Sequence, residues 1–237
     1  MHFNRLNQIL LFNNFNNKNI QNKISLESLK NVKRSLKLKF LKEGQNSMPF
    51  KNSVEEGGGN HMERLKYVEP DEADNFTKRL FKRVGMVPNL YCMMANSPMA
   101  FDGFLKLNAS LEGAKLEKRY REMIYLATSS INGCNYCQAS HTATSVEGGI
   151  LTLEETIQAR RLESPDPRAN ALLLFSREVI EKRGKVSDET LNALRDHGFT
   201  DEEIVEALGT ISMATFSNYV ANVGRPELDY LDAPPVD

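Results

Sequence analysis

Cysteine is scarce in this sequence, and long apolar runs are missing. Only three of the 237 residues are cysteine, an odd and sparse set that excludes the disulfide framework of a small secreted domain. The strongest apolar runs, such as residues 171–175, are much shorter than the roughly 20 residues that cross a bilayer. We therefore predict a soluble protein without a membrane segment, in the reducing environment of the cytoplasm.

A large excess of one charge is also missing, because the net charge of the whole chain is −1. The two signs are nevertheless unevenly distributed. Residues 1–61 carry ten Lys and Arg against four Asp and Glu, and subtraction from the totals of 30 and 31 leaves twenty against twenty-seven in residues 62–237. This acidic body has no basic stripe interleaved with aromatic residues, which argues against a nucleic-acid partner.

The first 61 residues differ in composition from the rest of the chain. They are rich in Asn, Lys, Ile and Phe, and the first 26 lack acidic groups, as transit peptides do. The sequence EEGGGNHM at 55–62 suggests a translated ribosome-binding site in front of a start codon. We interpret residues 1–61 as a disordered leader and residues 62–237 as the domain, with a natural flexible extension as the alternative.

Helix signals dominate from residue 71 onward, and no segment alternates with a period of two. Ser97 followed by proline is typical of a helix start, as is Ser164 or Asp166 before the next such proline. Thr152 and Thr200 each begin a capping box, in which a threonine and the third residue after it satisfy backbone N–H groups reciprocally. The body is therefore predicted to be all-α, with about seven or eight helices.

Two predicted helices are apolar around much of their circumference, at residues 169–180 and 204–223. A helix of this kind needs cover on more than one side. Either these are central helices of a bundle or they form subunit interfaces, and both features are compatible with a homo-oligomer.

The densest group of reactive side chains is the stretch GCNYCQASH at residues 133–141. We predict a helix over 117–131, a turn at Asn132 and Gly133, and Cys134 in the first turn of the next helix, where the positive end of the dipole favours a thiolate. Cys134, Cys137 and His141 are then spaced i, i+3, i+7 and share one face.

A carboxylate is expected to join this face. If the two helices pack antiparallel about the turn, Glu122 falls within about one helical turn of His141. A carboxylate beside an imidazole fixes its tautomer and strengthens it as a base. Glu122, Cys134, Cys137 and His141 together suit thiol chemistry, because the thiolate is the reactive form and a neighbouring base can take its proton.

The spacing of these four residues resembles the signature of the alkylhydroperoxidase D-like, or carboxymuconolactone decarboxylase, family: a Glu, eleven residues, then C-x-x-C-x-x-x-H. This chain has it without a gap, as EMIYLATSSINGCNYCQASH. The resemblance extends to residues 84–111 upstream and 216–229 downstream, and it does not include residues 1–61.

The resemblance implies an all-α, multi-helix, oligomeric thiol peroxidase that needs no cofactor and no metal. Cys137 resembles the peroxidatic thiolate and Cys134 the resolving cysteine of the redox pair. Glu122 and His141 resemble the proton relay of the family. The implied partners are a hydroperoxide and a dithiol reductant, either lipoamide on a protein or a thioredoxin-like protein.

One position departs from the best-known branch of the family. Tyr136 stands between the cysteines where that branch has a second histidine, so any relay role of that histidine is lost. The decarboxylases of the family lack the cysteine pair, which disfavours lactone chemistry here.

Three other interpretations remain open. The four residues are a plausible tetrahedral zinc set, although their ligands crowd on one helix. The cysteines are otherwise inert core residues, as we expect of Cys92, or the chain is a non-catalytic helical oligomer that senses redox state or zinc. His197, beside Gly198, is expected to cap a helix C-terminus rather than to act in catalysis.

Overall fold

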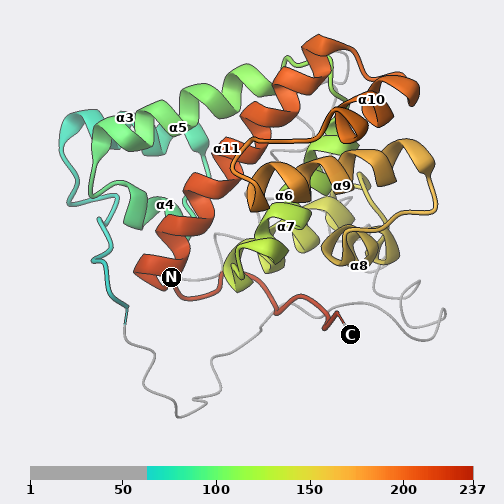
Figure 1. The fold of residues 1–237 in the computed structure, drawn as a ribbon. Helices are drawn as coiled ribbons and strands as arrows, with labels where there is room; N and C mark the ends of the chain where they lie inside the picture. The colour runs from blue at the N-terminus through green and yellow to red at the C-terminus, as the bar shows by residue number, and fades with distance from the viewer. Residues whose placement is uncertain (1–62, 237) are drawn as a thin grey trace, which may run out of the picture. The chain divides into compact units, whose positions relative to one another are not determined.

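The computed structural model describes residues 63–236, so our interpretation of residues 1–61 lies outside the described part. Within it the chain forms nine α-helices and no β-strand, which confirms the predicted all-α class (Figure 1). The helices are α3 (Asn75–Val84), α4 (Asn89–Met94), α5 (Pro98–Leu111), α6 (Lys118–Ile131), α7 (Asn135–Glu147), α8 (Leu153–Arg161), α9 (Pro167–Glu181), α10 (Asp188–Asp196) and α11 (Asp201–Gly224). The short helix α4 is the hardest to delimit from sequence, because no side chain caps its first turn.

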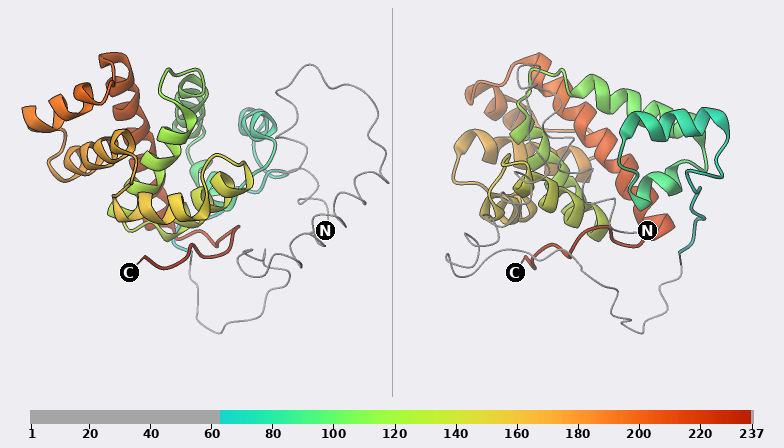
Figure 2. Two further views of the ribbon diagram at one scale, coloured as in Figure 1. Left: turned by 90° about the vertical axis from the view of Figure 1, so that its right-hand side faces the viewer. Right: turned by 180° about the vertical axis from the view of Figure 1, so that it is seen from behind.

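Helix α6 is the centre of the packing. It contacts α7, α8, α9 and α11, and its side chains are buried on nearly every face. Two groups of helices lie on either side of α11: α3, α4 and α5 on one, and α8, α9 and α10 on the other (Figure 2). The pair α6–α7, which carries the GCNYCQASH stretch, is therefore held from several directions.

The buried apolar side chains form two main clusters. The larger one joins α6 to α9, α10 and α11 and contains Leu126, Leu172 and Phe175 among its fully buried members. The second cluster, which we call the cysteine cluster, joins α3, α4 and α5 to the start of α7 and contains both Cys134 and Cys137. The reactive stretch is thus part of a packed core.

The predicted helix caps are confirmed. Ser97 accepts the N–H of Ala100 at the start of α5, and both capping boxes are present. Of the two candidates for α9, Asp166 is the cap, because its carboxylate accepts the N–H of Arg168 at 3.0 Å. Ser164 instead accepts the N–H of Asp166.

The Thr200 capping box fixes the start of α11, the longest helix described. The Thr200 hydroxyl accepts the N–H of Glu203, and the Glu203 carboxylate accepts the N–H of Thr200. Thr200→Ala is expected to lower the free energy of unfolding by about 1 kcal/mol, because it leaves a backbone donor of the first turn without its partner. Urea denaturation checks this, and Thr200→Ser is the matched control that keeps the hydroxyl. An alanine variant as stable as the serine variant would contradict it.

The two helices predicted to be apolar on several sides, α9 and α11, differ in how much of their apolar surface is buried. In α9 most of the apolar side chains are buried, whereas α11 also exposes a stripe of them along one face. The members of this α11 stripe are Val205, Leu208, Phe216, Tyr219 and Val223. In the described part of the chain, no helix is long and apolar enough to cross a membrane.

Candidate active site

The turn between α6 and α7 has the predicted form. Helix α6 ends at Ile131 with Asn132 as its C-cap, and Gly133 follows with a φ of 62°. A left-handed φ of this kind is strained for residues with a Cβ, so glycine suits this reversal. Cys134 is the N-cap of α7 and not a residue of its first turn, because its backbone is still extended. The prediction for Cys134 was wrong by one position.

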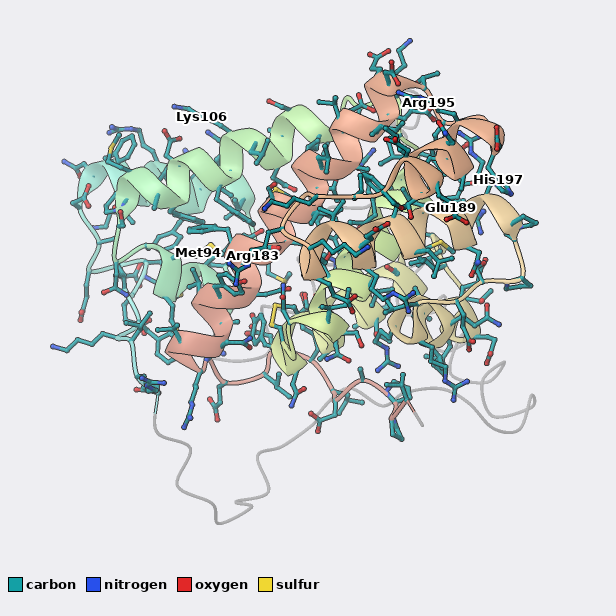
Figure 3. The ribbon with its side chains drawn as sticks, in the orientation of Figure 1. Met94, Lys106, Arg183, Glu189, Arg195 and His197 are labelled. Atoms are coloured by element: carbon teal, nitrogen blue, oxygen red, sulfur yellow. A yellow bond between two sulfur atoms is a disulfide. The ribbon has the colours of Figure 1, made fainter. Side chains whose placement is uncertain are left out.

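The structure joins Cys134 and Cys137 in a disulfide, with their Cα atoms 5.3 Å apart (Figure 3, yellow bond). The sulfur of Cys134 also accepts the N–H of Cys137 at 3.2 Å. This contact is the usual role of an N-cap side chain, taken here by sulfur in place of oxygen.

Both members of the disulfide are buried. Cys134 is 0% exposed and Cys137 is 3% exposed. Leu90 and Met94 of α4 and Ala221 of α11 belong to the same cysteine cluster. The disulfide therefore lies beneath the surface and not at an open edge.

Glu122 and His141 meet as predicted. The Nδ1 atom of His141 lies 2.9 Å from Oε2 of Glu122, and the Ser145 hydroxyl donates to the same oxygen at 3.0 Å. Burial alone raises the pKa of Glu122, but the charge of His141 and the hydrogen bonds from His141 and Ser145 outweigh it. The pKa of Glu122 is therefore below its usual value.

The ionisation of Glu122 determines the orientation of the imidazole. An ionised carboxylate only accepts hydrogen bonds, so Nδ1 of His141 must carry the hydrogen of the shared bond. In the neutral imidazole the lone pair then lies on Nε2. The side chain of His141 is 26% exposed and that of Glu122 is 12% exposed, so the imidazole is the more accessible end of the pair.

Tyr125 completes the setting of the imidazole. Its ring stacks on that of His141, with centroids 4.5 Å apart and an angle of 19° between planes. Burial, followed by the charge of Glu122, raises the pKa of Tyr125, so the phenol stays neutral. Sequence reasoning missed Tyr125 and Ser145, although Tyr125 lies three residues after Glu122 and Ser145 four after His141, both on shared helix faces.

Tyr136 occupies a different environment from the Glu122–His141 pair. Its hydroxyl donates to the carboxylate of Asp229 and accepts the N–H of Leu90 at 3.3 Å. The same Asp229 oxygen accepts the N–H of Asn89 at 3.0 Å. Burial and then the charge of Asp229 raise the pKa of Tyr136. Tyr136 therefore connects the start of α7 to α4 and to the segment after α11.

The remaining candidate residues lie elsewhere or take structural roles. Cys92 is buried in α4, and His197 is the C-cap of α10, with Nδ1 2.7 Å from the carbonyl oxygen of Ala193. In Figure 3 His197 lies beside Arg195, far along the molecule from the disulfide. A zinc site made of Glu122, Cys134, Cys137 and His141 would need both cysteines as thiolates. In this structure the two sulfurs are bonded to each other instead. Among residues 63–236, no group of three or more His, Cys, Asp or Glu side chains has the geometry to hold a metal ion.

Comparison with known proteins agrees with the fold. Residues 98–178 match the model of the Carboxymuconolactone decarboxylase family. An alkylhydroperoxidase AhpD core structure, of an uncharacterized peroxidase-related protein from Ralstonia eutropha JMP134, is 27% identical with a TM-score of 0.61, over 72% of this chain and 97% of that one. A peroxidase-related protein from Silicibacter sp. TM1040 is 25% identical with a TM-score of 0.59, over 73% of this chain and 97% of that one. Among curated proteins none matches significantly.

The same fold occurs in the debrominase Bmp8, whose structure was solved in complex with 2,3,4-tribromopyrrole. It is 15% identical with a TM-score of 0.57, over 72% of this chain and 92% of that one. Fold and site together define an all-α protein of the alkylhydroperoxidase D-like type with a disulfide-forming cysteine pair. Residues 98–178 are thus similar to the carboxymuconolactone decarboxylase family, and the fold is similar to that of peroxidase-related proteins of the alkylhydroperoxidase type.

Proposed function

We propose that this protein is a thiol peroxidase that reduces hydroperoxides through Cys134 and Cys137. The observation that carries the proposal is the disulfide between the N-cap Cys134 and Cys137 of α7, the helix that also carries His141. The imidazole of His141 is hydrogen-bonded to Glu122. A cysteine pair supplies two electrons, and a carboxylate–imidazole pair moves the accompanying protons.

The reaction begins at Cys137. Its thiolate attacks one oxygen of the hydroperoxide, the O–O bond breaks, and the sulfur becomes a sulfenic acid. The departing oxygen takes a proton and leaves as an alcohol or as water. His141, oriented through Nδ1 by Glu122, is the group that takes the thiol proton and returns it to this oxygen.

Cys134 then resolves the sulfenic acid. Its sulfur attacks that of Cys137, an S–S bond forms, and water leaves with the sulfenic oxygen. The backbone N–H of Cys137, 3.2 Å from the Cys134 sulfur in the disulfide, is placed to stabilise negative charge on Cys134 during this step. A dithiol reductant, lipoamide-bearing or thioredoxin-like, returns two electrons and two protons. A reducing cytoplasm is the location that we propose.

A non-catalytic sensor is the second candidate. The burial of both sulfurs favours the sensor. A disulfide that reductants reach only rarely would report an oxidation event once, and would not be reduced often enough for repeated catalysis. The fold alone does not decide between them, since one fold hosts unrelated reactions.

Peroxide consumption with a dithiol donor separates the two candidates. The peroxidase is expected to consume many equivalents of cumene hydroperoxide per protein when dihydrolipoamide is present, and about one without it. Cys92→Ala is the matched control, because it removes the cysteine that lies outside the disulfide. Consumption that stops at one equivalent with the donor present would support the sensor.

Homo-oligomer formation through the α11 stripe is a further part of the proposal. Val205 is 66% exposed and Tyr219 is 57% exposed, which is unusual for apolar residues on the longest helix described.

A charge at either position would be buried without a partner in a subunit interface. Val205→Lys is expected to shift the protein to a smaller species in size-exclusion chromatography with light scattering. Met99→Lys, at a 72% exposed residue outside the stripe, is the control. Equal masses for both variants would contradict the proposed interface.

A further inference from the structure

The segment after α11, residues 225–236, has no helix of its own, yet it is fixed to the rest of the domain at several points. It turns back at the end of α11 and runs past α7 towards α8 (Figures 1 and 2). Leu228 packs against the cysteine cluster, which contains both sulfurs of the redox pair. This segment thus covers part of the cluster that contains the disulfide.

The strongest anchor of the segment is Asp229. Its carboxylate accepts the hydroxyl of Tyr136 and the N–H of Asn89. The side chain of Asn89 donates to the carbonyl oxygen of Glu227 at 3.0 Å, so α4 holds the segment at two neighbouring residues. Tyr136 lies between Cys134 and Cys137 in sequence. Its hydrogen bond to Asp229 therefore links the start of α7, where the disulfide lies, directly to this segment.

Two further anchors follow along the chain. Tyr230 is 6% exposed, so its side chain is buried against the domain. The carbonyl oxygen of Pro234 accepts a hydrogen bond from the guanidinium of Arg160 at 2.7 Å. The segment is therefore attached beyond Asp229 as well, so that residues 227–230 can open locally without releasing the end of the chain.

Reduction of the disulfide requires such an opening. A thiolate must approach one sulfur in line with the S–S bond, yet the two cysteines are 0% and 3% exposed. The other elements of the cysteine cluster are helices packed in the core, whereas residues 227–230 have no helix of their own. They are held by the packing of Leu228, the burial of Tyr230 and the hydrogen bonds at Glu227 and Asp229. Segments of this kind open at lower cost than core helices.

We propose that residues 227–230 form a latch, closed by the hydrogen bond between Asp229 and Tyr136, which limits the access of thiols to the Cys134–Cys137 disulfide. This inference rests on the proposed peroxidase function and adds to it. Tyr136 and Asp229 would determine which reductants reach the disulfide. A small dithiol enters through a brief local opening, and a protein reductant must hold the latch open. Tyr136 thus acts on access to the sulfurs and takes no part in the proton relay.

The step under test is thiol–disulfide exchange. One thiolate of the reductant bonds to a sulfur of the pair and breaks the S–S bond, and the second then displaces it. Both cysteines end as thiols, and the reductant ends as its own disulfide. No peroxide takes part, so the measurement stays informative if the proposed peroxidase activity is absent.

The experiment measures the rate at which dithiothreitol reduces the oxidised full-length protein, followed by the mass of alkylated peptides. Tyr136→Phe and Asp229→Ala are each expected to raise this rate about ten-fold, the effect of losing one hydrogen bond to a charged group. The two variants remove the same shared bond, so the effect of the double variant is expected to be smaller than the product of the two single effects. Asp229→Ala also removes the acceptor of the Asn89 N–H and is expected to be at least as fast as Tyr136→Phe. Asp229→Asn keeps an acceptor oxygen and is expected to restore a rate close to that of the wild type. With a thioredoxin-like protein as reductant, the acceleration should be larger than with dithiothreitol.

Thr200→Ala is the control for a general loss of stability. Thr200 caps α11 at the end opposite to Arg225, and its loss destabilises the fold without touching the latch. An unchanged reduction rate in this variant, together with faster rates in the latch variants, supports the proposal. Equal acceleration in all variants would show that access follows unfolding of the domain and would overturn it, as would unchanged rates in Asp229→Ala. Should Tyr136→Phe fail to fold, Asp229→Ala against Asp229→Asn decides alone.

Discussion

Cys137→Ser is expected to abolish peroxide turnover, with a loss of about a thousand-fold or more, as removal of a catalytic nucleophile causes. A serine hydroxyl does not attack a peroxide oxygen, and it cannot store the product as a sulfenic acid. The measurement is the steady-state rate of hydroperoxide consumption with an excess of a dithiol donor. Retention of activity above about a tenth of the wild-type rate would contradict the assignment of Cys137.

Cys134→Ser provides the sharper comparison, because it keeps the nucleophile and removes only the resolving sulfur. This variant is expected to consume one equivalent of peroxide and then to stop, with a sulfenic acid on Cys137 that dimedone traps. If the sulfenic acid instead formed on Cys134 in the Cys137→Ser protein, the roles would be reversed. The N–H contact at the Cys134 sulfur makes that reversal the alternative to test.

Glu122→Gln is expected to slow the oxidation of Cys137 by about a hundred-fold, the usual order for a lost acid–base group. The amide oxygen can still accept from Nδ1 of His141, but the charge that favours a proton on the imidazole is gone. Single-turnover rates at limiting peroxide measure this step without the reductant. Ser145→Ala is the matched control, since it removes one hydrogen bond to the same carboxylate but keeps its charge, and a loss of only a few-fold is expected.

The same substitution has a consequence for stability. The folded-state pKa of Glu122 is lowered, so its stabilising contribution is present above the unfolded carboxyl pKa of about 4.3 and is lost as the pH falls through the folded value. Glu122→Gln is therefore expected to be less stable than the wild type near neutral pH, and the difference should shrink below about pH 4. Urea denaturation at a series of pH values checks the sign. A difference that does not change with pH would show that the charge of Glu122 is not involved.

The four-residue site could be predicted because its geometry is local. The turn at Asn132 and Gly133 fixes the register of α6 against α7, and helix periodicity then brings Glu122 to His141. The caps of α5, α8 and α11 were predictable for a similar reason, since each depends on residues within one helical turn. These features need no knowledge of the rest of the chain.

The latch could not be predicted in this way. Tyr136 and Asp229 are separated by 93 positions, and residues 227–230 have no periodic pattern that would place them on the cysteine cluster. The burial of both sulfurs likewise depends on α4 and α11, which approach α7 only in the folded domain. Tyr125 was within reach of helix periodicity, but stacking on His141 requires a side-chain direction that sequence does not give.

The most direct test of the peroxidase account is the reaction of the reduced protein with one equivalent of hydroperoxide, followed by peptide mapping with mass spectrometry. The account predicts a peptide lighter by two hydrogens and linked between Cys134 and Cys137, with Cys92 unchanged. Recovery of both cysteines as thiols, with the peroxide unconsumed, would contradict it.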